Sequence, residues 1–200
     1  MRIASVLAIA LALAVPAIAE DAAPQTGTPP ALQEGAMQLT AVELTPQPMI
    51  YVSTRSSMES QAIQQVVGDA FTALGKFLGE AQVTPLGPPM AIYSNWSEGQ
   101  ITTDVGFPVS AADAAKATGN VLAGSTPGGH AVKAIHKGPY EGMAATYAAI
   151  EAQMASAGIA QGTVSWEVYV GDPETTAAAE LITEIYMQIS AEDAAKLPAN

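Results

Sequence analysis

The clearest pattern in the chain is a regular alternation of apolar and polar positions over residues 181–189. A period of two residues predicts a β-strand whose two faces differ in polarity. Glu184 is the one charged residue of this stretch, Tyr186 lies on the same side of the strand, and no basic residue is near in the sequence. The pattern therefore predicts a carboxylate beside an aromatic ring and without a neutralising partner. One side carries Leu181, Thr183, Ile185, Met187 and Ile189, and the other carries Ile182, Glu184, Tyr186 and Gln188.

A second copy of this pattern occupies residues 101–109, and a gapless alignment places Asp104 against Glu184 and Thr103 against Thr183. The same order of elements precedes each copy: a strand, an amphipathic helix with apolar residues at steps of three and four, and a second strand. The predicted strands are 49–54, 90–93 and 101–109 in the first half and 130–136, 164–169 and 181–189 in the second, with helical stripes from Ile63 to Leu78 and from Tyr140 to Met154. Ser56 and Glu59 have the spacing of a capping box at the start of the first helix.

This order predicts an α+β fold of tandem duplicated β-α-β-β units. Such units form an antiparallel sheet with the two main helices on one face. We expect a pseudo-twofold axis to relate the units and a ligand groove to lie where the halves meet. Residues 110–129, which are rich in alanine and glycine, are interpreted as the connector.

The N-terminal region lies outside this repeat. A cationic start, an apolar run over residues 3–15 and Ala17-Ile18-Ala19 form the three parts of a secretory signal, so we expect cleavage after residues 1–19. The run is short for a membrane span, and we expect an exported protein, periplasmic or secreted, with no integral membrane segment after cleavage. Residues 20–40 are predicted to be a disordered linker, followed by a domain at 41–190 and a C-terminal tail at 191–200.

Composition narrows the possible chemistry. The chain has no cysteine, which excludes a disulfide, a thiolate metal site and a cysteine nucleophile. Its net charge of −12 and its lack of a basic cluster argue against nucleic-acid binding and weakly favour cationic ligands. His130 and His136 are about 20 Å apart along one extended strand, so they cannot chelate one metal together. We expect no metal and no cofactor, and a hydrogen-bonding role for His136 beside the Gly138-Pro139 break.

Four motifs resemble those of the GyrI-like small-molecule-binding family, the effector-binding domain of AraC-type and MerR-type multidrug regulators. Residues 136–141 resemble H-R-G-P-Y-E, and residues 181–186 resemble L-x-T-E-I-Y. Residues 87–93 and 103–109 resemble G-P-P-x-x-x-Y and x-D-V-G-x-P-V. The resemblance covers about residues 40–190. In place of a helix-turn-helix stands the predicted signal peptide, so direct transcriptional control is not expected of the exported form.

The resemblance implies the tandem β-α-β-β fold, which the haem-binding SOUL family shares. It also implies that Glu184 lies in a groove for multidrug binding, where the carboxylate would contact cationic aromatic molecules. A poorly solvated carboxylate favours a cation, and aromatic faces add cation–π attraction. The aromatic candidates for the groove are Tyr93, Tyr140, Trp166, Tyr169 and Tyr186.

Three functions remain open. The favoured one is exported, non-enzymatic binding of small amphipathic or aromatic, possibly cationic, molecules, with no catalytic residue. The second is hydrolysis of strained electrophilic molecules, as in the cyclopropanoid cyclohydrolases that the family includes, with Glu184 as general base and Tyr140 orienting water or the leaving group. The third is a structural or peptide-binding module. The oligomeric state is not predicted.

Overall fold

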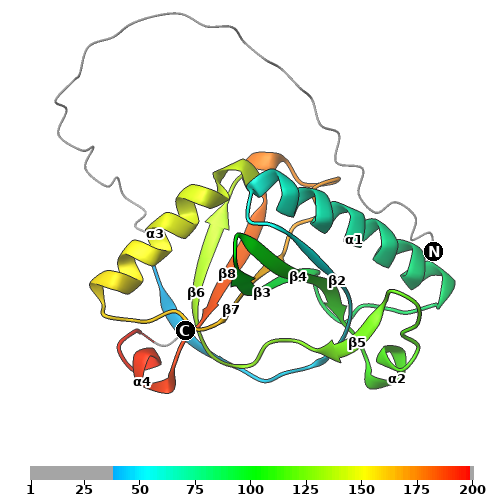
Figure 1. Ribbon diagram of the computed structural model, residues 1–200, viewed down its shortest axis with the longest axis horizontal. Coiled ribbons are helices and arrows are strands. Elements are labelled where there is room, and N and C mark those ends of the chain that lie inside the picture. Colours follow the sequence, from blue (N-terminus) through cyan, green and yellow to red (C-terminus); the bar gives the residue numbers. More distant parts are fainter. Residues whose placement is uncertain (1–37, 199–200) are drawn as a thin grey trace, which may run out of the picture.

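The computed structural model describes residues 38–198; the predicted signal peptide and most of the predicted linker lie outside these residues. Eight strands form one antiparallel sheet in the order β1-β6-β8-β7-β3-β4-β2-β5 (Figure 1). The strands are β1 (Thr40–Leu44), β2 (Pro48–Ser57), β3 (Met90–Ser97), β4 (Gln100–Pro108), β5 (Leu122–Ser125), β6 (Gly129–Lys137), β7 (Val164–Tyr169) and β8 (Ile182–Gln188). The helices are α1 (Ser60–Glu80), α2 (Ala111–Ala114), α3 (Met143–Ser156) and α4 (Ala191–Ala194), with 3₁₀ turns η1 (Tyr140–Gly142) and η2 (Ala178–Glu180).

The predicted duplication is confirmed. Strands β2, β3 and β4 with α1 form the first half, strands β6, β7 and β8 with α3 form the second, and the halves join where β3 pairs with β7. Helices α1 and α3 lie along the same side of the sheet (Figure 1). The α+β fold with an antiparallel sheet and two main helices is therefore the one that the hydrophobic pattern predicts.

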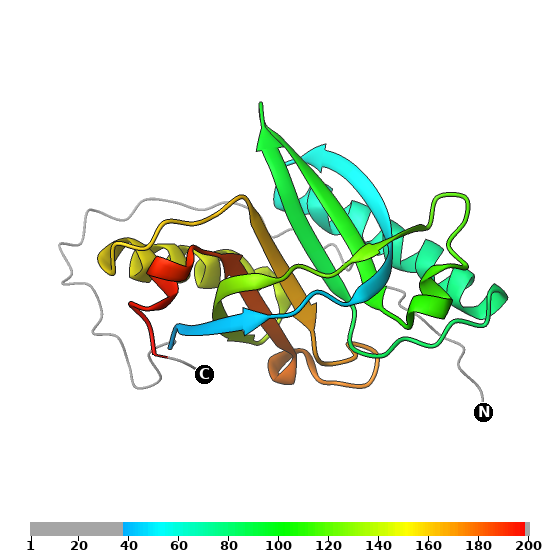
Figure 2. The ribbon, with the colours of Figure 1, turned by 90° about the horizontal axis from the view of Figure 1, so that it is seen from below.

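The edge strands are exchanged between the halves. Strand β1 precedes the first half in sequence but pairs with β6 of the second, whereas β5 precedes the second half but pairs with β2 of the first. The two crossing segments contact each other, because the Gln47 and Thr126 backbone amides donate to oxygen atoms of the opposite residue over 2.9 and 2.8 Å (Figure 2). The sequence pattern did not predict β1 or β5, because both strands are short and β5 is exposed along its whole length.

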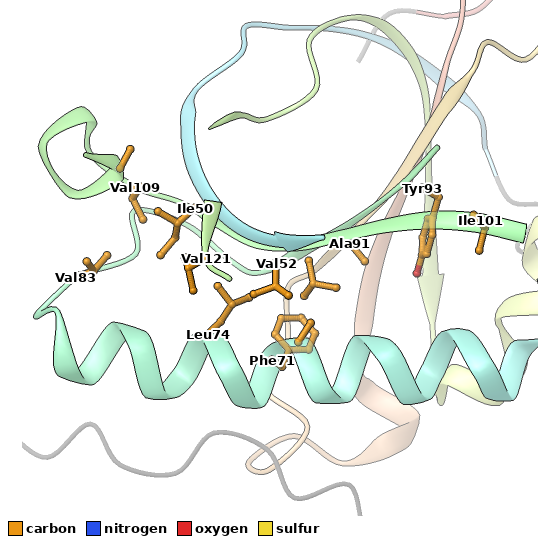
Figure 3. Close-up of a cluster of buried hydrophobic side chains, with 13 residues drawn as sticks. Ile50, Val52, Phe71, Leu74, Val83, Ala91, Tyr93, Ile101, Val109 and Val121 are labelled. Carbon is orange, nitrogen blue, oxygen red and sulfur yellow. The ribbon is translucent and has the colours of Figure 1, made fainter. Parts of the chain in front are cut away.

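The first helix begins later than its capping box predicts. Ser56 and Ser57 continue β2 and pair with Ile101 and Gln100, and the helix starts at Ser60 without a side-chain cap. The capping-box prediction is therefore wrong, because both serines are paired with β4 as part of strand β2. The helix buries Ala70, Phe71 and Leu74 against β2, β3 and β4 (Figure 3), as its apolar stripe predicts.

Helices α2 and α4 extend the duplication beyond the predicted units. Residues 110–116 read S-A-A-D-A-A-K and residues 190–196 read S-A-E-D-A-A-K, at the same spacing of 80 positions that relates Asp104 to Glu184. In each copy the first serine caps a four-residue helix. Within residues 38–198 no helix combines the length and the apolar character needed to cross a bilayer.

Candidate functional site

The register of the strands divides the side chains between two faces of the sheet. Val105, Ala91, Glu167 and Ile185 stand opposite one another on neighbouring strands, and this face, here called the helix face, packs against α1 and α3. The opposite face, here called the far face, has its own apolar cluster, in which Trp166 lies. A residue and its immediate neighbour on a strand therefore face different environments.

Glu167 places a carboxylate near the centre of the helix face. The residue is only 8% exposed. Three tyrosine hydroxyls donate to it. Tyr147 of α3 donates to Oε1 over 2.7 Å, Tyr169 of the same strand donates to Oε2 over 2.7 Å, and Tyr93 of β3 donates to Oε2 over 3.1 Å. No ion pair to Glu167 is present among residues 38–198. Among these residues, hydrogen bonds from tyrosine hydroxyls stabilise the carboxylate, and no ion pair does.

Two further rings pack against Tyr169, one of the tyrosines that donate to this carboxylate. Tyr140, in the turn before α3, packs edge-on against Tyr169 with 5.8 Å between ring centroids. Phe71 of α1 packs edge-on against the same ring at 5.9 Å. Figure 3 shows Tyr93 pointing from the sheet toward the side of α1, in line with Phe71 and its apolar neighbours. Glu167 with these five aromatic residues, drawn from both halves, is called the Glu167 site below.

Burial decides the protonation of this cluster. It raises the pKa of Glu167 above the usual glutamate value, while the three tyrosine hydrogen bonds and His136 lower it in part. Burial, together with the Glu167 charge, holds the pKa values of Tyr93, Tyr147 and Tyr169 well above the usual tyrosine value. The tyrosines therefore remain hydrogen-bond donors at neutral pH.

His136 anchors the turn that carries Tyr140. Its Nε2 lies 3.1 Å from the Pro139 carbonyl oxygen, and its Nδ1 lies 2.7 Å from the Thr146 hydroxyl. A carbonyl oxygen only accepts, so Nε2 carries a proton and donates. The hydrogen-bonding role predicted for His136 is confirmed. Residues 38–198 contain no group of three or more side chains suited to a metal ion.

Glu184 lies on the far face and is already neutralised. Lys133 of β6 lies 2.7 Å from one carboxylate oxygen, and the Tyr186 hydroxyl donates to the other over 2.6 Å. Trp166 stacks on Tyr186 at 5.2 Å with nearly parallel rings, and Lys133 also lies over the Tyr186 ring. The expectation of a carboxylate without a neutralising partner is therefore wrong for Glu184, because strand pairing places Lys133 beside it. That Glu184 contacts a ligand stays a prediction.

The predicted site residues fall into two separate groups. Tyr93, Tyr140 and Tyr169 belong to the Glu167 site, whereas Trp166 and Tyr186 belong with Glu184 on the far face. Glu184 and Tyr140, the pair proposed for hydrolysis, lie on different faces and do not meet.

Sequence reasoning missed Glu167 and Tyr147 as site residues. A signal for Glu167 exists: Glu167 and Tyr169 repeat the spacing of Glu184 and Tyr186, and in both pairs the tyrosine donates to the glutamate two positions earlier. For Tyr147 there is no comparable signal, because its position on the helical stripe is equally typical of core packing.

A family model described as the GyrI-like small molecule binding domain matches residues 37–190. The resemblance that the sequence motifs indicate is thereby confirmed. Among curated proteins, no relative of this chain was found.

Solved structures share the fold at low sequence identity. The C-terminal domain of EcmrR superimposes with a TM-score of 0.60 and 20% identity, over 77% of this chain and 98% of that one. EcmrR in a complex with DNA gives a TM-score of 0.63 and 18% identity over 78% of this chain, and this chain spans only 58% of that protein. SAV2435, in a structure bound to tetraphenylphosphonium, gives 0.59 and 11% identity, over 78% of this chain and 96% of that one.

Proposed function

The chain belongs to the family of GyrI-like small molecule binding domains, and on that premise we propose that its ligand binds at Glu167. The proposed ligand is a small amphipathic or aromatic molecule with a positive charge, and the protein binds it without chemical change. The observation that carries this proposal is a buried carboxylate that has hydroxyl donors but no ion-pair partner among residues 38–198.

The energetics of burial favour such a ligand. An ionised carboxylate in an apolar environment loses hydration worth several kcal/mol or more, and hydrogen bonds from neutral donors recover only part of it. A ligand cation supplies the missing opposite charge. Tyrosine rings around the carboxylate add cation–π and stacking attraction for a flat aromatic cation. Anionic ligands are disfavoured for the same electrostatic reason.

Access to the carboxylate requires movement of the rings. Glu167 is 8% exposed, so a ligand reaches it only when aromatic side chains around it turn aside. The T-shaped contacts of Tyr169 with Tyr140 and Phe71 are worth about 0.5–1.5 kcal/mol each, which ligand stacking can replace. The fold of SAV2435, a protein whose structure was determined with the hydrophobic cation tetraphenylphosphonium, supports the choice of this probe.

The test compares the two glutamates that share the same spacing to a tyrosine. Tetraphenylphosphonium is titrated by isothermal calorimetry into the wild type, Glu167→Gln and Glu184→Gln. We expect Glu167→Gln to weaken binding about 10- to 100-fold, the range for one buried charged interaction, and Glu184→Gln to leave binding unchanged. Equal affinity of the wild type and Glu167→Gln contradicts the proposal, and a loss confined to Glu184→Gln moves the site to the far face.

We also propose that the protein acts after export, in the periplasm or outside the cell. This rests on the three-part pattern of residues 1–19 in the sequence. N-terminal sequencing of protein recovered from the periplasm and the medium tests it. Mature protein should begin at Glu20, and an intact N-terminus in the cytoplasm contradicts export.

A further inference from the structure

Two threonine hydroxyls are buried without a hydrogen-bond partner among the described residues. Thr103 and Thr183 are both 0% exposed, and neither Oγ1 atom bonds to another group. They occupy equivalent positions in the two halves, each directly before the aligned Asp104 or Glu184. Buried hydroxyls in folded proteins are almost always hydrogen-bonded, so these two unpaired hydroxyls require an explanation.

Thr183 borders the Glu167 site. It faces Tyr169 across the β7–β8 pair and His136 across the β6–β8 pair, so its side chain is on the helix face. Glu167 stands opposite Ile185, two residues further along β8. Sheet geometry sets such a diagonal pair about 7–8 Å apart. A small molecule that contacts the Glu167 carboxylate can therefore also reach the Thr183 hydroxyl.

The polar side chains next to Thr183 are already engaged. Tyr169 donates its hydroxyl proton to Glu167. Both ring nitrogens of His136 are used, by the Thr146 hydroxyl and the Pro139 carbonyl. No neighbour among residues 38–198 pairs with Thr183, which leaves its hydroxyl available to a bound molecule.

Thr103 lies in the other half, farther from the site. It faces Tyr93 of β3 and Thr54 of β2, and strand β3 separates it from β7. Two strand spacings amount to about 10 Å, and Thr103 is also displaced along the strand relative to Glu167. The two threonines thus have the same burial and the same unsatisfied hydroxyl but different distances from Glu167.

We propose that the Thr183 hydroxyl is a specificity-determining group of the Glu167 site. The ligand is then a cation with a hydrogen-bonding group, such as an N–H, ether or carbonyl, beside its charged centre. Purely aryl cations fill the same site without using Thr183. This inference rests on the proposed function and adds the polar group that the ligand carries.

The experiment uses two probes and two matched variants of the full chain. Rhodamine 6G is a flat cation with N–H and ester groups, and tetraphenylphosphonium is a cation with neither. Thr183→Val replaces the hydroxyl by a methyl group. Thr103→Val makes the identical change at the other unpaired hydroxyl, which lies farther from Glu167. Binding of rhodamine 6G is measured by fluorescence polarisation, and that of tetraphenylphosphonium by calorimetry.

We expect Thr183→Val to weaken rhodamine 6G binding about tenfold, the factor for one hydrogen bond of ordinary strength. Its affinity for tetraphenylphosphonium should not change, and Thr103→Val should bind both probes like the wild type. Thr183→Ser keeps the hydroxyl and should retain the wild-type ratio of the two affinities. That ratio also serves as the readout if the valine variant folds poorly.

Three results overturn the inference. They are unchanged rhodamine 6G affinity in Thr183→Val, an equal loss for both probes, and a wild type that binds tetraphenylphosphonium but not rhodamine 6G. None of these affects the proposed function, which is decided by tetraphenylphosphonium binding to Glu167→Gln. If both the wild type and Glu167→Gln bind that probe equally, the proposed function fails whatever Thr183 does.

Discussion

Glu167 and Glu184 each accept a hydrogen bond from the tyrosine two positions further along the same strand, yet their environments differ. Lys133 neutralises Glu184 in a partly exposed pair, with side chains 18% and 24% accessible. Within the described part of the chain, the donors to Glu167 are all tyrosine hydroxyls, and the residue is almost fully buried. The same local spacing therefore yields an ion pair on one face and a buried carboxylate hydrogen-bonded to tyrosine hydroxyls on the other.

The pH dependence of stability follows from the raised pKa of Glu167. Because the folded protein binds this proton more tightly than the unfolded chain, protonation stabilises the fold. The stabilisation is complete below the usual glutamate pKa and is lost as pH rises through the higher folded value. We expect the free energy of unfolding of Glu167→Gln, relative to the wild type, to rise with pH across this range.

Urea denaturation at a series of pH values from about 4 to 8 measures this difference. Burial also raises the pKa of Asp104, but this residue is common to both proteins and cancels in the comparison. Parallel pH profiles for the wild type and Glu167→Gln contradict the prediction.

At the scale of single elements, a lysine just after α2 and another just after α4 bind the loops that follow the two long helices. Lys116 bonds the Gln82 carbonyl over 3.1 Å after α1, and Lys196 bonds the Gly158 carbonyl over 2.7 Å after α3. Gln82 and Gly158 both have positive φ, 50° and 63°. The left-handed turn at each helix end, and the short helix with the lysine that follows it, are thus parts of the repeated unit.

The serine caps of these short helices make a testable contribution. Ser110 Oγ accepts from the Asp113 amide and Ser190 Oγ accepts from the Asp193 amide, each over 3.0 Å. We expect Ser110→Ala and Ser190→Ala each to lower the free energy of unfolding by about 1 kcal/mol, measured by urea denaturation. Glycine at either position should lower the free energy of unfolding by only about a few tenths of a kcal/mol. Alanine variants as stable as the wild type argue against a capping role.

At the scale of the whole molecule, the two halves depend on each other. The exchanged strands β1 and β5 tie each half to the other, and the far-face cluster joins Met49, Met90 and Ile92 of the first half to Ala131, Trp166 and Tyr186 of the second. Tyr93 likewise reaches across the seam to Glu167. The site therefore exists only when both halves are folded together.

We accordingly expect one cooperative unfolding transition. Trp96 packs in the first half, and Trp166 is buried in the second. In Trp166→Phe the fluorescence of Trp96 reports the first half, and in Trp96→Phe the fluorescence of Trp166 reports the second. In each variant the urea midpoint from fluorescence should coincide with that from far-UV circular dichroism. Separate midpoints within one variant indicate halves that unfold independently.

Much of the fold was predictable because residues 181–189 alternate, the same order of elements occurs twice, and the two long helices carry apolar stripes. The edge strands β1 and β5 were not, since they lie at the margins of the sheet and bury little. Three of the five predicted aromatic residues belong to the Glu167 site. The strand that supplies its carboxylate was predicted, but the pattern of 164–169 does not distinguish which side the helices cover.

The periodicity of the sequence is enough to define the duplicated α+β unit and the side chains that share a face of each strand, because side-chain direction follows from local backbone geometry. It likewise determined that each glutamate has a tyrosine on its own side. Tertiary structure alone decided which glutamate is neutralised. Strand pairing brings Lys133 to Glu184 from 51 positions away and Tyr93 to Glu167 from 74 positions away. Contacts over such separations depend on the order and register of the strands, which no local pattern encodes.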